Sequence, residues 1–145
     1  MPLIFTNGCF DILHRGHLEL LSFCKSLGEV VVGLNSDESI RLLKGKERPI
    51  NNQSDRKYFL ESLIYVDKVI IFNDLTPYTL IEKIKPDIIV KGGDYNIESV
   101  VGNDLCEVKI FKIKKQSFKG QRDINLQSLE NSVREKIGLN VLIKN

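Results

Sequence analysis

Several patterns that define common classes of protein are absent from this sequence of 145 residues. It has only three cysteines, none of them in a CxxC pair, which argues against a disulfide framework and against a zinc site. No apolar run approaches the roughly 20 residues of a membrane span. No basic start followed by an apolar stretch marks a signal peptide. We therefore expect a cytoplasmic protein with reduced cysteines and no membrane partner.

An excess of charge of one sign is also missing, since 21 basic and 19 acidic residues leave a net charge of +2. This balance is too small to indicate nucleic acid as a partner by itself. Neither the P-loop pattern GxxxxGK[ST] nor the dinucleotide fingerprint GxGxxG occurs. A composition of 42% hydrophobic and 28% charged residues suits a globular protein with one core.

Short apolar runs alternate with amphipathic stretches along the chain. We predict strands at 3–6, 29–35, 68–72, 87–91 and 108–113, with helices between them at 17–27, at 36–43, from 54 and from 76. The helix from 54 is expected to turn Tyr58, Phe59, Leu60, Leu63 and Ile64 inward. This alternation predicts an α/β fold with a Rossmann-like, doubly wound, five-stranded parallel sheet. Residues 1–113 are predicted to form the main domain, and 114–145 are expected to add a basic segment and a C-terminal helix packed on the same domain.

The segment TNGCFDILHRGH (6–17) follows the first predicted strand directly. Gly8 permits a tight turn, and backbone N–H groups at the start of the next helix point at an anion. His14 and His17 share one face if that turn is helical, and Gly16 keeps bulk out of the space between them. Imidazole N–H groups donate to phosphate oxygens, and phosphate charge raises the pKa of imidazole. The segment predicts a site that stabilises charge on a phosphate during displacement.

This segment resembles TNGCFDxLHxGH, the signature of the HxGH nucleotidyltransferases. The resemblance continues in order through NSD (35–37), LLKGKERPI (42–50), YVDKVIIF (65–72), TP (76–77) and KPDIIVKGGDY (85–95). The KGxxRP and VKGGDY combination is similar to the heptose 1-phosphate adenylyltransferase branch, and the similarity runs from about Leu3 to about Phe111. NSD and KGGD, like TNGCFD, lie at the carboxyl ends of predicted strands, where ligands bind in such sheets.

The resemblance implies an enzyme that joins a nucleoside triphosphate to a sugar 1-phosphate and releases pyrophosphate. ATP and heptose 1-phosphate are the favoured substrates, for ADP-heptose and surface polysaccharide synthesis. Mg²⁺ is implied as the cofactor that accompanies the triphosphate, and a homodimer is implied as the assembly. The attacking phosphate is already an anion, so the reaction needs no general base and no enzyme nucleophile. Catalysis then comes from positioning and from neutralising charge.

The resemblance also assigns roles to individual residues. The catalytic residues are His14, His17 and Lys44. Those expected to bind the nucleotide or its phosphates are Thr6, Asn7, Gly8, Cys9, Phe10, Gly16, Gly92, Gly93 and Asp94. Those expected to bind substrate are Asp11, Asp37, Arg48 and Arg56. Asp11 can alternatively orient a histidine, hold Mg²⁺ or cap a turn, and Asp37 can cap the following helix. No set of metal ligands is predicted.

The chain departs from the family after the fifth predicted strand. Family members carry a Gly-x-Ser-Thr-Thr-like segment there, whereas residues 114–123 read KKQSFKGQRD. Six basic residues and no acidic one lie between Val108 and Arg122. One hypothesis is that Lys119 and Arg122 replace the missing hydroxyls as phosphate contacts, and the alternative is a solvated tail.

Other functions stay open at this stage. A CTP-dependent enzyme acting on glycerol 3-phosphate is disfavoured by Ile64, where that branch often has arginine. A nucleotide-binding relative without turnover is a second alternative. A nucleic-acid module is disfavoured because only Phe111 and Phe118 interleave aromatic rings with the basic segment.

Overall fold

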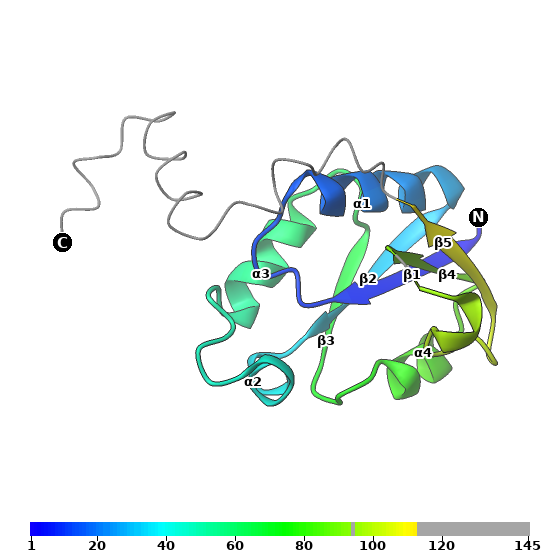
Figure 1. Ribbon diagram of the computed structural model, residues 1–145. Coiled ribbons are helices and arrows are strands. Elements are labelled where there is room, and N and C mark those ends of the chain that lie inside the picture. Colours follow the sequence, from blue (N-terminus) through cyan, green and yellow to red (C-terminus); the bar gives the residue numbers. More distant parts are fainter. Residues whose placement is uncertain (94, 113–145) are drawn as a thin grey trace. The chain divides into compact units, whose positions relative to one another are not determined.

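The computed structural model describes residues 1–93 and 95–112, and within them five parallel strands form one sheet. The strands are β1 (Leu3–Gly8), β2 (Glu29–Asn35), β3 (Lys68–Phe72), β4 (Ile88–Gly92) and β5 (Glu107–Phe111), in the spatial order β3-β2-β1-β4-β5 (Figure 1). The predicted five-stranded, Rossmann-like α/β fold is confirmed. Met1–Ile113 make up one compact unit. The predicted basic segment and helix at 114–145 lie outside the described residues.

Helices cover both faces of the sheet (Figure 1). They are α1 (Arg15–Leu27), α2 (Asp37–Lys44), α3 (Gln53–Glu61) and α4 (Tyr78–Ile84), with a short 3₁₀ helix, η1, at Ile97–Ser99. Successive strand residues point to opposite faces. Ile4 therefore packs in one core cluster with Leu21 of α1 and Leu60 of α3, while Phe5 packs in a second cluster with Ile81 of α4.

Polar side chains cap the helices and set where they begin. Ser36 accepts a hydrogen bond from the amide of Ser39 at 3.1 Å and starts α2. Asn52 accepts one from the amide of Asp55 at 2.8 Å, so α3 begins at Gln53. Gly28 ends α1, as the sequence predicts. None of the helices in the described residues is long and apolar enough to cross a membrane.

The predicted inward face of α3 is largely wrong. Tyr58, Phe59 and Ile64 are 71%, 45% and 83% exposed. The helix has nine residues, and the ones it buries are Arg56 and Leu60, four positions apart on a single stripe. About two and a half turns present one such stripe to the sheet, so Tyr58 and Phe59 stay exposed, and Ile64 lies beyond the end of the helix.

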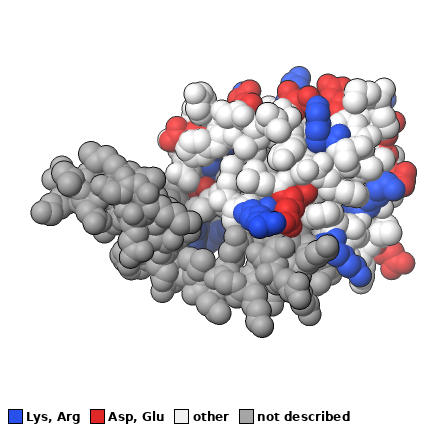
Figure 2. Space-filling view, turned by 90° about the horizontal axis from the view of Figure 1, so that it is seen from above, with Lys and Arg blue, Asp and Glu red and all other residues white. Residues whose placement is uncertain are grey.

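The strand order places the site. From β1 the chain builds outward to β2 and β3 and then returns to add β4 and β5 on the other side of β1. The carboxyl ends of β1 and β4 flank this reversal, which is where ligands bind in open parallel sheets. In the coloured part of the face that Figure 2 shows, basic and acidic side chains are intermixed, and neither sign forms a continuous patch.

Candidate nucleotide and phosphate site

The loop between β1 and α1 turns at Phe10 and not at Gly8. Gly8 is the last residue of β1, whereas Phe10 has φ of +45°, which is uncommon for a residue with a side chain. The Phe10 ring is 6% exposed and lies edge-on to the His17 ring, with centroids 5.1 Å apart. A Cβ on Gly8 would stand 3.1 Å from this ring. The absence of a side chain at Gly8 therefore makes room for the Phe10 ring, which packs against the His17 ring.

His14 and His17 lie together at the start of α1, as the spacing predicts. His14 is the N-cap, and its Nδ1 accepts a hydrogen bond from the amide of Gly16 at 3.0 Å. His17 Nδ1 accepts one from the amide of His14 at 3.4 Å, and the two rings stack with centroids 3.8 Å apart. Because each Nδ1 is an acceptor, a neutral ring carries its proton on Nε2. The reciprocal cap thus sets the tautomer of both histidines.

Both rings favour the neutral form in this structure. Burial lowers the pKa of His17 to about 4, with further lowering from the nearby charges of His14 and Lys44. Burial also lowers the pKa of His14. Lys44 lies in the last turn of α2. The structure therefore brings His14 and His17 into direct contact, and the charge of Lys44 acts on His17 from α2.

Asp11 ties the loop after β1 to the segment before α3. Its carboxylate accepts hydrogen bonds from the amides of Ile50, at 2.8 and 3.1 Å, and Asn51, at 2.8 Å. The side chain of Asn51 donates back to the Asp11 carbonyl at 2.6 Å. Arg48 Nη1 lies 3.7 Å from the carboxylate. Asp11 thereby holds a distant backbone segment against the site, a role that its position in the sequence does not reveal.

Arg56 is fully buried and joins four segments. Its Nη1 donates to the carbonyls of Cys9 and Asn35, both at 2.8 Å. Nε donates to the Asn51 carbonyl at 2.9 Å, and Nη2 pairs with the Asp37 carboxylate at 2.8 Å. The expected contact of Arg56 with substrate would require it to give up these bonds. In this structure Arg56 instead orients Asp37 and the two loops around it.

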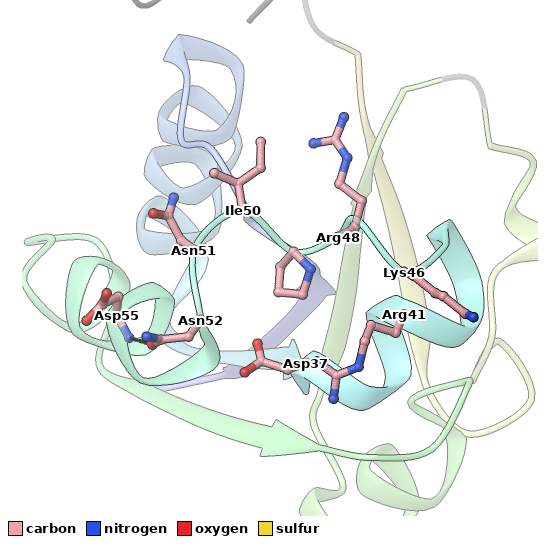
Figure 3. A pocket seen from close by; sticks show the side chains of 9 residues that line it. Asp37, Arg41, Lys46, Arg48, Ile50, Asn51, Asn52 and Asp55 are labelled. Carbon is pink, nitrogen blue, oxygen red and sulfur yellow. Dashed lines mark hydrogen bonds between the residues drawn. The ribbon is translucent and has the colours of Figure 1, made fainter. Parts of the chain in front are cut away.

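A polar cleft of about 290 Å³ lies beside Asp37, the carboxylate that pairs with Arg56 (Figure 3). Figure 3 shows Asp37, Arg41 and Lys46 along one side of it, Asn51, Asn52 and Asp55 along the other, and Arg48 on the loop between them. Three cations and two carboxylates line the cleft, and Asp37 is already paired with Arg56. The cleft thus offers hydrogen-bonding and cationic groups to an anionic, hydroxyl-rich ligand. It includes two residues expected to bind substrate, Asp37 and Arg48.

The other residues expected at the nucleotide lie on the same edge of the sheet. Thr6 is fully buried, and its hydroxyl has no hydrogen-bond partner among the described residues. Asn7 and Cys9 are half-buried, and Gly16 is buried in the first turn of α1. Gly92 ends β4, and Gly93 has φ of +94°, with no described atom within 4 Å of where a Cβ would stand. This leaves room for a ligand to approach the Gly93 backbone. Asp94 lies outside the described residues.

Sequence reasoning missed two residues of this edge. Asn51 braces Asp11, and no local pattern distinguishes it from other loop asparagines. Lys91 is part of VKGGDY but was given no role, although it points toward the end of β1, with its Nζ 3.5 Å from the carbonyl of Asn7. Its place directly after a buried apolar run is the signal that was available.

The side chains described offer no ready-made metal centre. Residues 1–93 and 95–112 contain no group of three or more His, Cys, Asp or Glu placed to hold an ion. The Asp11 carboxylate already accepts three backbone hydrogen bonds. These residues fit a Mg²⁺ ion that is held mainly by substrate phosphates and water, as Mg²⁺ commonly is.

The strand β1 and the histidine-capped helix α1, at the carboxyl edge of a parallel sheet, form a site suited to a ligand that carries phosphate. The chain belongs to the cytidylyltransferase-like family, whose model matches residues 5–137, and this is a nucleotidyltransferase family. The resemblance to HxGH nucleotidyltransferases is therefore confirmed.

Within this family, the chain is similar to bifunctional HldE proteins and to a lipopolysaccharide core biosynthesis protein. The chain is 55% identical over 112 residues to the bifunctional protein HldE of Aliarcobacter butzleri, which covers 76% of this chain and 24% of the relative. It is 58% identical over 106 residues to HldE of Nitratiruptor sp., covering 72% and 23%. The chain spans about a quarter of the length of these curated relatives. A solved lipopolysaccharide core biosynthesis protein from Thermoplasma volcanium matches with a TM-score of 0.64 and 32% identity, over 79% of this chain and 97% of that one.

Proposed function

We propose that this protein is an adenylyltransferase that joins ATP to heptose 1-phosphate and releases pyrophosphate. The observation that carries the proposal is the stacked His14–His17 pair at the start of α1, beyond the end of β1. The similarity to HldE proteins and to a lipopolysaccharide core biosynthesis protein supports a sugar substrate and a role in making surface polysaccharide. The VKGGDY and KGxxRP motifs support the heptose branch.

The reaction is a displacement at the α-phosphorus of ATP. An oxygen of the acceptor phosphate forms a bond to the α-phosphorus. The bond between the α-phosphorus and the oxygen that bridges it to the β-phosphate breaks, and pyrophosphate leaves with the electron pair of that bond. The two Nε2–H groups donate to phosphate oxygens, and Lys44 supplies positive charge beside them, so that the developing charge is stabilised without proton transfer. The neutral tautomers set by the cap are the forms that donate from Nε2.

Mg²⁺ would enter this site with the triphosphate and would neutralise part of its charge. Asp11 and the carboxylates of the cleft would be the groups of this chain that accept hydrogen bonds from its water shell, and none of them would need to be a direct ligand. The cytoplasmic location and the homodimer implied by the resemblance stay predictions. Size-exclusion chromatography with light scattering measures the second directly.

Pyrophosphate release in the presence of Mg²⁺ tests the proposal. ATP and CTP are each paired with heptose 1-phosphate and with glycerol 3-phosphate. We expect release with ATP and heptose 1-phosphate, and much less with the other pairs. Preference for CTP and glycerol 3-phosphate would instead identify the protein as a cytidylyltransferase. Nucleotide binding without release from any pair would identify a binding protein and reject the enzyme.

Two substitutions separate the chemistry of the histidines from their structural role. His14→Asn keeps a good N-cap, and His17→Gln keeps the reciprocal acceptor of a capping box. Each removes an imidazole donor, so each should lower kcat by about 100-fold or more while Tm stays near that of the wild type. Activity retained in both variants would contradict the assigned role, and a large fall in Tm would show that the cap had not been preserved.

A further inference from the structure

Lys91 is a lysine in an unusual place, close to the point where the strand order reverses. It lies near the end of β4, the strand between β1 and β5. Its ammonium group is 3.5 Å from the Asn7 carbonyl and 5.5 Å from the centre of the Tyr95 ring. Burial lowers the pKa of Lys91, and nearby Cys9 partly opposes this. Among residues 1–93 and 95–112, no carboxylate forms an ion pair with it.

A lysine without an acidic partner is costly to bury, because its ammonium group loses water. A single long hydrogen bond to a carbonyl and one ring contact replace little of that hydration. An anion bound next to the ammonium group would replace much more. Lys91 therefore has the environment of a ligand-binding cation.

A small cavity lies against Lys91. It has a volume of about 150 Å³, with Asn7 and Lys91 at the strand ends and the segments 75–77 and 99–101 around it. Thr76 and Ser99 contribute hydroxyl groups, while Leu75, Pro77, Val100 and Val101 contribute apolar surface. The Tyr95 ring completes the lining. One cation, two hydroxyls and an apolar wall suit a phosphate group carried on a carbon skeleton.

We propose that Lys91 binds the phosphate monoester of the acceptor substrate in this cavity. The inference rests on the proposed function for the identity of the acceptor, and on the cavity for its location. Pockets that enclose whole ligands measure roughly 300–1,000 Å³, so this one admits a phosphate and the carbons next to it but no nucleoside triphosphate. The carbonyl that Lys91 contacts belongs to Asn7, the second-last residue of β1, and the loop after β1 leads to His14 and His17. An acceptor phosphate on Lys91 would thus lie at the same sheet edge as the histidines.

Steady-state kinetics of Lys91→Met test this assignment. Methionine keeps the length of the side chain and removes its charge. We expect the KM for heptose 1-phosphate to rise by roughly 10- to 100-fold, as for the loss of one charge-assisted hydrogen bond, with the KM for ATP unchanged. Tm should not fall, because a desolvated charge has been removed. Lys68→Met is the matched control, since Lys68 is an exposed strand lysine at the amino end of β3, and it should change neither KM.

Arg48→Ala tests whether the acceptor phosphate binds in the polar cleft instead, because Arg48 lines that cleft. If Arg48→Ala raises the KM for the acceptor and Lys91→Met does not, the acceptor phosphate sits in the cleft and the proposal is overturned. Equal increases in both KM values for Lys91→Met, or a fall in its Tm, indicate a structural role and also overturn it.

Binding without turnover keeps this test separate from the proposed function. Heptose 1-phosphate and inorganic phosphate are titrated calorimetrically into the wild type, Lys91→Met and Lys68→Met in the absence of nucleotide. Binding that is lost only in Lys91→Met supports the phosphate site even if no substrate pair releases pyrophosphate. Binding that is the same in all three proteins, or absent from the wild type, overturns the site even if the enzyme is active.

Discussion

At the scale of single residues, His17 combines a structural and a chemical role. It receives the amide of His14, stacks on the His14 ring and packs against Phe10. Protonation of Nδ1 would remove the acceptor that closes the cap, and it would place a second charge beside Lys44. The features that set the donor tautomer therefore also make the charged ring unfavourable.

The free energy of unfolding should depend on pH because the charged form of His17 is unfavourable in the folded protein. The pKa of His17 is about 4 in the folded protein and 6.5 as its ordinary value. As the pH falls below 6.5 the unfolded chain binds a proton that the folded chain does not bind until about pH 4. The contribution of His17 to the free energy of unfolding therefore decreases across this window and is constant above it. His14, whose pKa is also lowered, acts in the same direction.

Urea unfolding of the wild type and His17→Gln between pH 7 and 4.5 measures the effect. The profile of His17→Gln should be flatter than that of the wild type. Asp67 does not interfere, because its lowered pKa lies below 3.8 and its contribution is lost only at more acidic pH. Parallel profiles for the two proteins would contradict the pKa of His17.

At the scale of elements, the site depends on a segment with no regular structure. Residues 48–51 contribute no strand or helix, yet they line the cleft and face the loop after β1. They are held there by Asp11, through three backbone hydrogen bonds. Arg56 of α3 adds a bond to the carbonyl of Asn51. The shape of the cleft thus follows from two side chains. Asp11 binds this segment from the loop after β1, and Arg56 links it to the distant carbonyls of Cys9 and Asn35.

Asp11→Ala should loosen this segment without unfolding the protein. Loss of the carboxylate leaves the amides of Ile50 and Asn51 to water, so their hydrogen exchange should accelerate while amides within α1 keep their protection. The free energy of unfolding should fall by about 1–3 kcal/mol. Asp74→Ala, at an exposed aspartate in the loop after β3, should change neither measurement. Unchanged exchange at Ile50 in Asp11→Ala would show that other contacts hold the segment.

At the scale of the whole molecule, stability comes from two apolar clusters separated by the sheet. Leu21 of α1 is fully buried in the cluster that includes Ile4 and Leu60. Leu42 of α2, in contrast, is 71% exposed.

Leu21→Ala should lower the free energy of unfolding by about 2–5 kcal/mol, because it removes apolar contacts and leaves a cavity between α1 and the sheet. Leu42→Ala should stay within about 0.5 kcal/mol of the wild type. Denaturant unfolding followed by circular dichroism measures both. Equal effects of the two substitutions would contradict the packing of α1 on β1 and β2.

Much of this arrangement was predictable because it depends on local patterns. The starts and ends of β2 and β3 follow from apolar runs, and Gly28 ends α1 as expected. The pairing of His14 and His17 follows from their spacing across a helix start. Wrong expectations arose where packing overrides pattern. Ile64 was expected inside but is 83% exposed, and the turn assigned to Gly8 occurs at Phe10.

The sequence by itself determined the fold class, the edge of the sheet at which the site lies and the class of reaction. Each of these rests on residues close together in the chain, such as a strand followed by a glycine and two histidines. Only the tertiary structure decided which charged groups face the site and which support it. Arg56 is buried because carbonyls from three other segments and one carboxylate converge on it. Lys91 points toward the end of β1 because two strands far apart in sequence lie side by side. Burial and pairing of charge depend on contacts between distant segments, and no local pattern contains them.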